Sequence, residues 1–167
     1  MLRPRLLLTF CVLAAGAAVL AGCGDTGEKR HLAKIEGNTP QDRQATKLLV
    51  DLLANDPQVR TAAANQLGDM KYRHEAVRDA LADRLKLDAV AGVRMACAKA
   101  LQKLGDEDSF GELQEGSAAG IIEAREVYLE VTRDLRQKSM QGDRAARATL
   151  MNLGEKYIDQ PATQPRT

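Results

Sequence analysis

The sequence predicts an all-α protein in which a short stack of helix pairs follows an exported leader. Apolar residues recur at spacings of three and four through most of the chain, which is the period of an amphipathic helix. Two stretches also repeat one another at an offset of 34 residues. Trp is absent and only three Tyr and two Phe occur, so the predicted core is aliphatic, which suits closely packed helices.

Residues 1–22 have the organisation of a signal peptide. Arg3 and Arg5 form a basic start, and an uncharged run follows from Leu6 to Gly22. A spanning helix needs about 20 predominantly apolar residues, and this run is slightly shorter. We therefore expect a cleaved leader, although an unprocessed membrane anchor remains the alternative.

The end of the leader carries a processing signal. Leu20, Ala21, Gly22 and Cys23 resemble the lipobox of bacterial lipoproteins at all four positions. The resemblance implies cleavage before Cys23, diacylglycerol on its thiol and acylation of the new amino terminus, and two or more chains give stable anchoring. Gly24 stands where many lipoproteins retained in the inner membrane carry Asp, which favours the outer membrane, facing the periplasm, in a Gram-negative cell.

Residues 23–38 and 159–167 flank the predicted helical domain, residues 39–158. The first segment is rich in Gly, Asp, Glu, Lys and Asn, which is typical of a flexible tether. The second contains Gln, Thr and two Pro, which is typical of a disordered tail.

Cap signals mark the first two helices. Thr39, Pro40 and Asp42 provide an N-cap, a proline at the first helical position and an acid in the first turn. Asp56 and Pro57 repeat this signal for the second helix. The predicted apolar stripes are Ala45, Leu48, Leu49, Leu52 and Leu53, and then Val59, Ala62, Ala63, Leu67 and Met70.

Self-similarity places two further helices after them. Val59, Arg60, Ala62, Ala64, Leu67 and Met70 recur as Val93, Arg94, Ala96, Ala98, Leu101 and Leu104. Leu49, Leu53 and Asp56 recur at an offset of 32 as Leu81, Leu85 and Asp88. The difference predicts a two-residue insertion in the turn from Ala89 to Gly92.

A repeat of this length built from two amphipathic helices resembles the HEAT-like repeats of alpha solenoids, particularly the short form found in phycobilin lyases. The resemblance implies a short right-handed solenoid of about three hairpins. In that family the Asp and the Arg usually support the turn and the contact between repeats. It therefore implies a scaffold role for Asp56, Arg60, Asp88 and Arg94.

The third pair is fainter. We predict a helix from about Ala118 to Lys138, followed by a second one from Asp143 towards Gly154. The stretch from Gly105 to Gly116 is acidic and reads as a connector with at most one helical turn. Terminal repeats of a stack are often atypical because they cap it.

Catalytic or metal chemistry is not indicated. The two histidines, His31 and His74, cannot supply the three protein ligands of a zinc site, and we expect His74 to cap a helix or face solvent. Asp106, Glu107 and Asp108 lack the alternation of a calcium loop. We expect no cofactor, and lyase activity does not follow from a repeat that occurs in many proteins.

Cysteine usage and charge narrow the function further. Cys11 leaves with the leader and Cys23 is lipidated, so Cys97 is the one remaining thiol, and its place in the repeat predicts burial. Without Arg3 and Arg5, 22 basic residues stand against 23 acidic ones, which argues against nucleic acid as a partner.

A partly basic face of the second helices is the predicted partner site. Its members are Arg60, Arg94, Lys99 and Lys103, with Arg144 and Arg147 in the third pair. Such a face suits an acidic segment of another envelope protein, whereas the plain alternative is an ordinary solvated surface. We expect a membrane-tethered, non-catalytic binding module. Two alternatives remain open: an envelope enzyme or metal-binding protein with a hidden site, and a self-associating structural lipoprotein. The sequence does not fix the oligomeric state.

Overall fold

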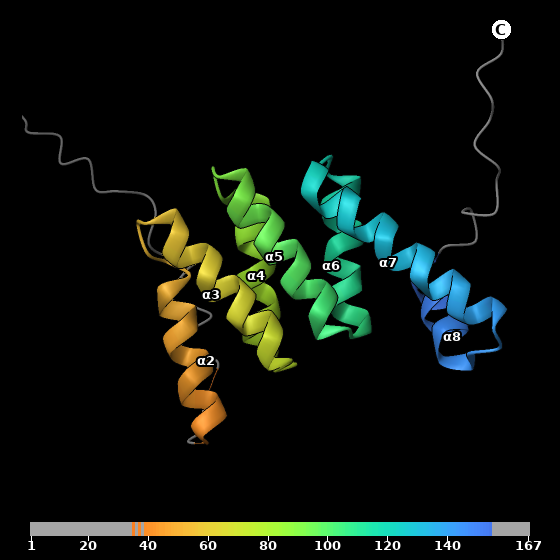
Figure 1. Cartoon of the computed structure of the whole chain (residues 1–167), viewed down its shortest axis with the longest axis horizontal. Helices are drawn as coiled ribbons and strands as arrows, with labels where there is room; N and C mark the ends of the chain where they lie inside the picture. The colour runs from red at the N-terminus through yellow and green to blue at the C-terminus, as the bar shows by residue number, and fades with distance from the viewer. Residues whose placement is uncertain (1–34, 36, 38, 155–167) are drawn as a thin grey trace, which may run out of the picture.

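The computed structural model describes residues 35, 37 and 39–154, and this part of the chain is helical without a strand (Figure 1). The helices are α2 (Pro40–Asp51), α3 (Pro57–Met70), α4 (Glu75–Leu87), α5 (Ala91–Leu104), α6 (Glu107–Ala118), α7 (Ile122–Met140) and α8 (Arg144–Asn152). None of these described helices is both long and apolar enough to cross a membrane. Cys23, the predicted leader and the predicted tail lie outside the described residues.

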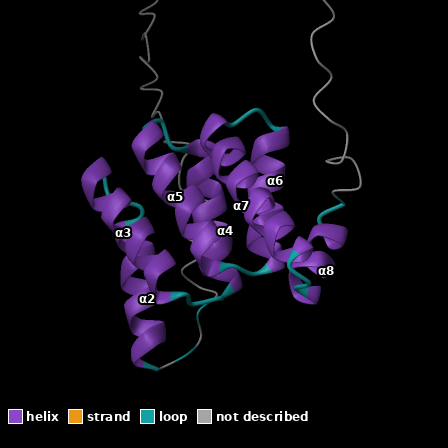
Figure 2. Cartoon of the chain, turned by 45° about the vertical axis from the view of Figure 1, so that its right-hand side comes forward, coloured by secondary structure: helices purple, strands orange, loops and turns teal. Residues whose placement is uncertain are grey.

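The helices form three consecutive hairpins, α2 with α3, α4 with α5, and α6 with α7, and α8 packs on α7. The second helices α3, α5 and α7 lie side by side in one layer, with α4 and α6 behind them, and α2 extends in view below α3 (Figures 1 and 2). Contacts between neighbouring second helices are much more extensive than those between neighbouring first helices. This imbalance is expected when the second helices line the inner side of a curved stack.

The first three helices begin at the residues that the sequence predicts. The Thr39 hydroxyl accepts a hydrogen bond from the Asp42 amide while the Asp42 carboxylate accepts one from the Thr39 amide, which is a capping box. Asp56 caps α3 by accepting a bond from the Gln58 amide at 2.8 Å. His74 caps α4 through Nδ1, which accepts a bond from the Ala76 amide at 3.1 Å, and this is one of the two roles expected for it.

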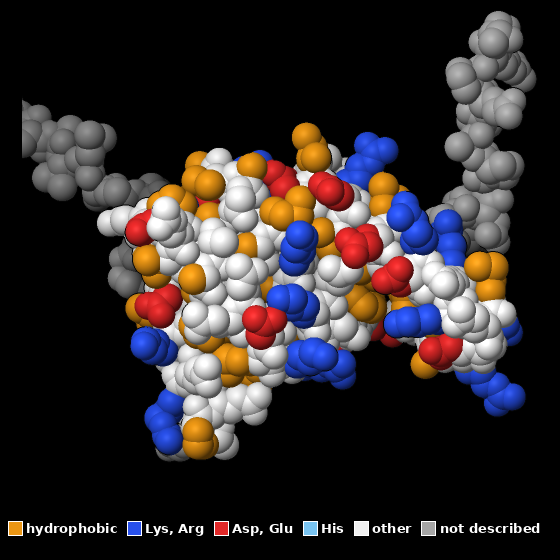
Figure 3. All heavy atoms as spheres, in the orientation of Figure 1, with side chains coloured by type: hydrophobic (Ala, Val, Ile, Leu, Met, Phe, Trp, Pro, Cys, Tyr) orange, Lys and Arg blue, Asp and Glu red, His pale blue; other side chains and the backbone are white. Residues whose placement is uncertain are grey.

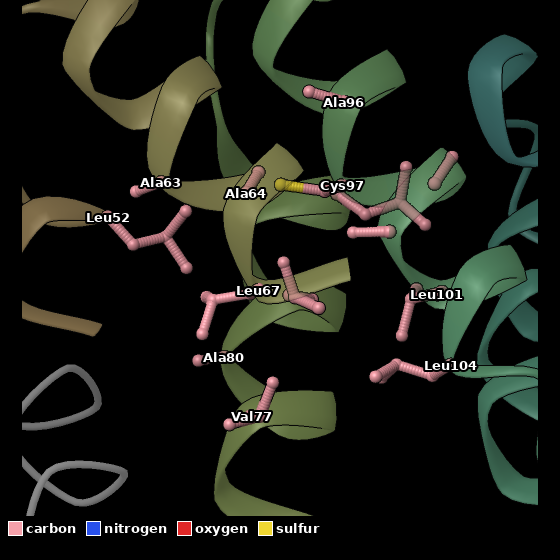
Figure 4. Packing of buried hydrophobic residues seen from close by; sticks show 14 of the residues in the cluster. Leu52, Ala63, Ala64, Leu67, Val77, Ala80, Ala96, Cys97, Leu101 and Leu104 are labelled. Atoms are coloured by element: carbon pink, nitrogen blue, oxygen red, sulfur yellow. The ribbon is translucent and has the colours of Figure 1, made fainter. Parts of the chain in front are cut away.

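The core is aliphatic and runs through all three hairpins. Leu52, Leu67 and Leu101 are fully buried in it (Figure 4). Val93 is 0% exposed, whereas its repeat equivalent Val59 is 39% exposed. The predicted burial of Val59 is therefore wrong, because α3 belongs to the first hairpin and no described helix precedes that hairpin on that side.

The stretch from Gly105 to Gly116 is not a connector. It contains most of α6, which Asp106 caps by accepting a bond from the Ser109 amide at 2.8 Å. A Cβ at Gly116 would lie 2.8 Å from the Ala124 Cβ, so this glycine allows α6 to approach α7 closely. The acidic residues that suggested a loop instead cap α6 and form its solvent-exposed face, and one of its glycines provides a packing contact.

The third hairpin consequently differs from the prediction. The helix expected from Ala118 to Lys138 is α7, and it is the second helix of a hairpin with α6 rather than the first of a pair with α8. The segment after Asp143 is helical as expected, but it stands apart as α8. Its C-terminal end contacts α6, because the Leu153 carbonyl accepts a bond from Gln114 and Asn152 donates one to Glu107.

Packing on the core also begins before Thr39. Ile35, within the segment predicted to be a tether, is partly buried against the core. The part of the tether from residue 23 to residue 34 lies outside the described residues.

Candidate functional site

Arg60 joins the first two second helices through a two-pronged ion pair. Its Nε donates to Asp88 Oδ2 at 2.7 Å and its Nη2 donates to Asp88 Oδ1 at 3.0 Å. Its Nη1 donates to the carbonyl oxygens of Ala54 and Asn55 at 2.8 and 2.9 Å. Asp88 in turn accepts a bond from the Val90 amide, in the turn that leads to α5.

The Asp88 carboxylate is held ionised by this arrangement. Burial acts to raise its pKa, but the hydrogen bonds from Arg60 and the Val90 amide outweigh burial and leave the pKa below its usual value. The bond to Asp88 raises the pKa of Arg60. The fork geometry is the one in which a guanidinium binds a carboxylate most strongly.

Arg94 forms the equivalent ion pair one hairpin later. We call each of these Arg–carboxylate contacts between neighbouring hairpins a joint. Its Nη2 and Nε donate to Glu123 Oε1 and Oε2 at 2.7 and 3.2 Å, and its Nη1 donates to the Asp88 carbonyl at 2.9 Å. The bond from Arg94 lowers the pKa of Glu123. The scaffold role that the family resemblance implies for Arg60, Asp88 and Arg94 thus agrees with their contacts, whereas Asp56 caps its own helix.

The residues of the predicted partner face therefore fall into two groups: arginines held in ion pairs between hairpins, and exposed lysines. Arg60 and Arg94 direct their guanidinium groups into the joints between repeats, where acceptors already occupy them. Lys103 reaches back across the layer to Asp69, with Nζ donating to Oδ1 at 2.7 Å in an exposed pair. Lys99 is exposed, and its side chain has no hydrogen bond or ion pair within the part of the chain that the structure describes.

Figure 3 shows this face of the molecule, with Lys and Arg side chains over α5 and α7 interspersed with acids. Arg144 and Arg147 are exposed on α8 rather than on a second helix of the stack. Those two residues do not continue the row of second-helix arginines, so their predicted place in it is wrong.

The groups considered for chemistry have structural roles. Asp106 is a helix cap, and Asp108 accepts a bond from Arg78 of α4 at 2.9 Å. No group of three or more His, Cys, Asp or Glu side chains suitable for a metal ion occurs among residues 39–154.

Cys97 is buried as predicted. Its side chain is 0% exposed within the core, and Ala64 of α3 points towards its sulfur (Figure 4). Burial raises the pKa of the Cys97 thiol to about 12. A thiol in this state is a core group and a poor nucleophile, because the thiolate is the reactive form.

Sequence reasoning missed Glu123 and Arg125, and a repeat signal could have found them. Buried Val93, Ala96, Cys97 and Ala100 of α5 correspond, at an offset of 31, to buried Ala124, Val127, Tyr128 and Val131 of α7. In that register Arg94 corresponds to Arg125. The third repeat escapes detection at offsets of 32 and 34, because it is shorter and contains Tyr128 in place of a small residue.

Comparison with known families agrees with this geometry. A family profile described as HEAT repeats matches residues 17–102 and also residues 46–120. These two ranges overlap and together span more than half of the chain. The chain belongs to the HEAT-repeat family. Neither the search of curated proteins nor the search of solved structures found a match. The all-helical stack of hairpins is thus a HEAT-repeat solenoid.

Proposed function

We propose that this HEAT-repeat protein is a lipid-anchored module of the bacterial cell envelope that binds another protein and performs no chemistry of its own. The observation that carries the proposal is the combination, in one chain, of a lipobox-like sequence ending at Cys23 and a HEAT-repeat stack whose first described helix begins at Pro40. Alpha solenoids present extended surfaces for partners. A lipid anchor would hold that surface at a membrane.

The exposed lysines of α5 provide a basic region for an acidic partner segment. Lys99 has no partner within the described residues, and Lys103 is held only by the exposed Asp69. Such exposed charges act mainly by steering a partner and contribute about 0.2 to 1 kcal/mol each. The contribution of Arg60 and Arg94 is then to hold the helices that carry these lysines in place.

Anchoring is tested by Cys23→Ser. The variant should incorporate no lipid label and should accumulate as an uncut precursor, because the cysteine thiol is the lipid acceptor. Gel mobility and metabolic labelling with a fatty acid measure both effects, and fractionation of the wild type tests the outer-membrane location that Gly24 favours. Normal maturation of the variant would contradict the anchor.

Protein binding is tested by isolating partners from native membranes with the tagged wild type, identifying them and titrating each one in purified form. The double reversal Lys99→Glu with Lys103→Glu should slow association, and added salt should slow the wild type, because the Debye length shortens. Arg94 is left intact, since reversing it would place two carboxylates together at Glu123. A wild type that binds no purified protein would refute the proposed function.

A further inference from the structure

The side of α7 that faces away from α5 carries residue types like those of an inter-repeat contact, although no further hairpin in the described part of the chain packs against it. We propose that this surface binds a single amphipathic helix of a protein partner, whose first turn carries a carboxylate that accepts hydrogen bonds from Arg125. We call the surface the α7 edge and define it as Ile122, Arg125, Leu129 and Arg133. The inference rests on the proposed function, because it names the surface by which a partner is bound.

The register between α5 and α7 shows what the edge corresponds to. Arg125 stands where Arg94 stands, and Leu129 stands where Ala98 stands. In α5 these positions face the next helix of the layer: Arg94 binds Glu123 of α7. The equivalent of Ala98 in α3 is Ala64, which points towards Cys97 of the next helix (Figure 4).

The apolar part of the edge is exposed where its equivalent is buried. Ala98 is 0% exposed, whereas Leu129 is 50% and Ile122 is 76% exposed. Ile122, Arg125, Leu129 and Arg133 are spaced at i, i+3, i+7 and i+11, which places them on one face of the helix. Large apolar side chains with this spacing on an end helix are unusual, since the outer face of a terminal repeat is normally polar.

The polar part of the α7 edge, Arg125, indicates that the partner carries a carboxylate. Arg60 and Arg94 each bind a carboxylate at the start of the following second helix, Asp88 just before α5 and Glu123 in the first turn of α7. Arg125 is exposed, and its side chain has no hydrogen bond or ion pair among residues 39–154. Its complement is therefore a helix with an acid at its start and aliphatic side chains opposite Leu129 and Ile122.

The position of α8 favours one helix over a second copy of the chain. Helix α8 packs on α7 and lies behind its C-terminal half (Figure 1), while Asn152 and Leu153 at its end contact α6. A second copy would bring α2 together with α3 and would meet α8. A lone helix needs only the place beside α7, in front of α8.

The test uses a synthetic peptide with the sequence of residues 121–140, because its Glu123 is the acid that an Arg at this position binds within the chain. Fluorescence anisotropy of the labelled peptide is followed as the full-length protein is added in detergent micelles. The wild type should bind saturably. Arg125→Glu should weaken binding by about tenfold or more, as for an interfacial charge pair, and Leu129→Asp should do so by about as much, because it places an unpaired charge in the apolar contact. A Glu123→Arg peptide should restore binding to the Arg125→Glu protein.

Lys47→Glu is the matched control, since Lys47 is exposed on α2, away from the edge, and it should leave peptide affinity unchanged. Circular dichroism should show the same helicity for every variant. Absent peptide binding, equal loss in the Lys47 control, or no restoration by the charge exchange would each overturn the proposal. Binding seen only after removal of residues 155–167 would make that segment the occupant and would also overturn it.

Two further measurements separate this inference from the proposed function. Concentration-dependent sedimentation of the wild type that Arg125→Glu abolishes would make a second copy the occupant and overturn the inference. A purified partner that binds the Arg125→Glu protein as well as the wild type would also overturn it, yet would leave the protein-binding function standing. Loss of that partner in the Arg125→Glu protein with retention in Arg144→Glu is the supporting result.

Discussion

Helices α5 and α7 have the same register and different surroundings. In α5, Ala98 is covered and Arg94 holds a carboxylate, whereas in α7 the equivalent Leu129 is half exposed and Arg125 has no ion pair within the described part. The residue types at these positions are similar, so the difference comes from the neighbour that each helix has. In a stack whose units contact only their neighbours, the role of a side chain therefore depends on its place along the stack.

The largest contrast is expected from leucine truncation. Leu101→Ala should lower the free energy of unfolding by about 2 to 5 kcal/mol, because it empties a fully packed site. Leu129→Ala should change it by about 0.5 kcal/mol or less, as for a surface position. Urea denaturation followed by circular dichroism measures both. Equal losses would mean that the α7 edge is covered within the chain.

A smaller effect is expected at the joint between α3 and α5. Asp88→Asn removes the charge that Arg60 binds and should lower the free energy of unfolding by about 1.5 to 3 kcal/mol, the range for hydrogen bonds to charged groups. Arg125→Gln, which removes an exposed charge without an ion-pair partner in the described part, is the control and should leave stability nearly unchanged. A harmless Asp88→Asn would show that the joint contributes little.

The same joints predict acid sensitivity. The pKa values of Asp88 and Glu123 are lowered in the folded protein from their ordinary values of 3.8 and 4.5. The unfolded chain therefore takes up protons first, and the stability from these groups, present above those values, is lost as pH falls through and below them. Urea midpoints measured from pH 6 to pH 3 should fall, and the fall should be shallower in Asp88→Asn. Parallel curves for the two proteins would contradict this.

Thiol labelling compares the solvent accessibility of a buried position in α5 with that of an exposed position in α7. With Cys11 and Cys23 changed to Ser, Cys97 should react with iodoacetamide only as fast as the core opens, because it is buried and its pKa is raised to about 12. Adding Leu129→Cys should introduce one rapidly labelled site. Rapid native labelling of Cys97 itself would instead show that the second hairpin opens readily.

The contrast between α5 and α7 also explains what the sequence could predict. The first four helices could be predicted from Thr39, Asp56, His74 and the repeat at an offset of 34. Helix caps and a repeated apolar stripe are both recognisable in the amino-acid sequence. Helix α6 was missed because Gly111 and Gly116 weaken its pattern. The meaning of Gly116 depends on Ala124, a residue on the next helix.

The sequence indicated the acid of a joint only where it is an Asp that precedes the second helix. The acid stands four residues before the Arg in the first repeat and six before it in the second, at Asp56 and Asp88. In the third repeat, Glu123 stands two residues before Arg125 and already lies within α7. A longer side chain there still reaches Arg94, and only the folded geometry shows that it does. The α7 edge is exposed because no further hairpin of the described part packs against that side of α7, and no local pattern encodes this.

The joint at Asp88 has a consequence for how such a chain can change length. The Asp88 carboxylate accepts hydrogen bonds from Arg60 of the hairpin before it, and Arg94 donates to Glu123 of the hairpin after it. The middle hairpin thus contributes one acceptor to the preceding unit and one donor to the following unit. Duplication of a unit such as residues 75–105 would add one of each and leave every other joint satisfied. The fold can therefore be lengthened in the gene by whole units without redesign of its junctions.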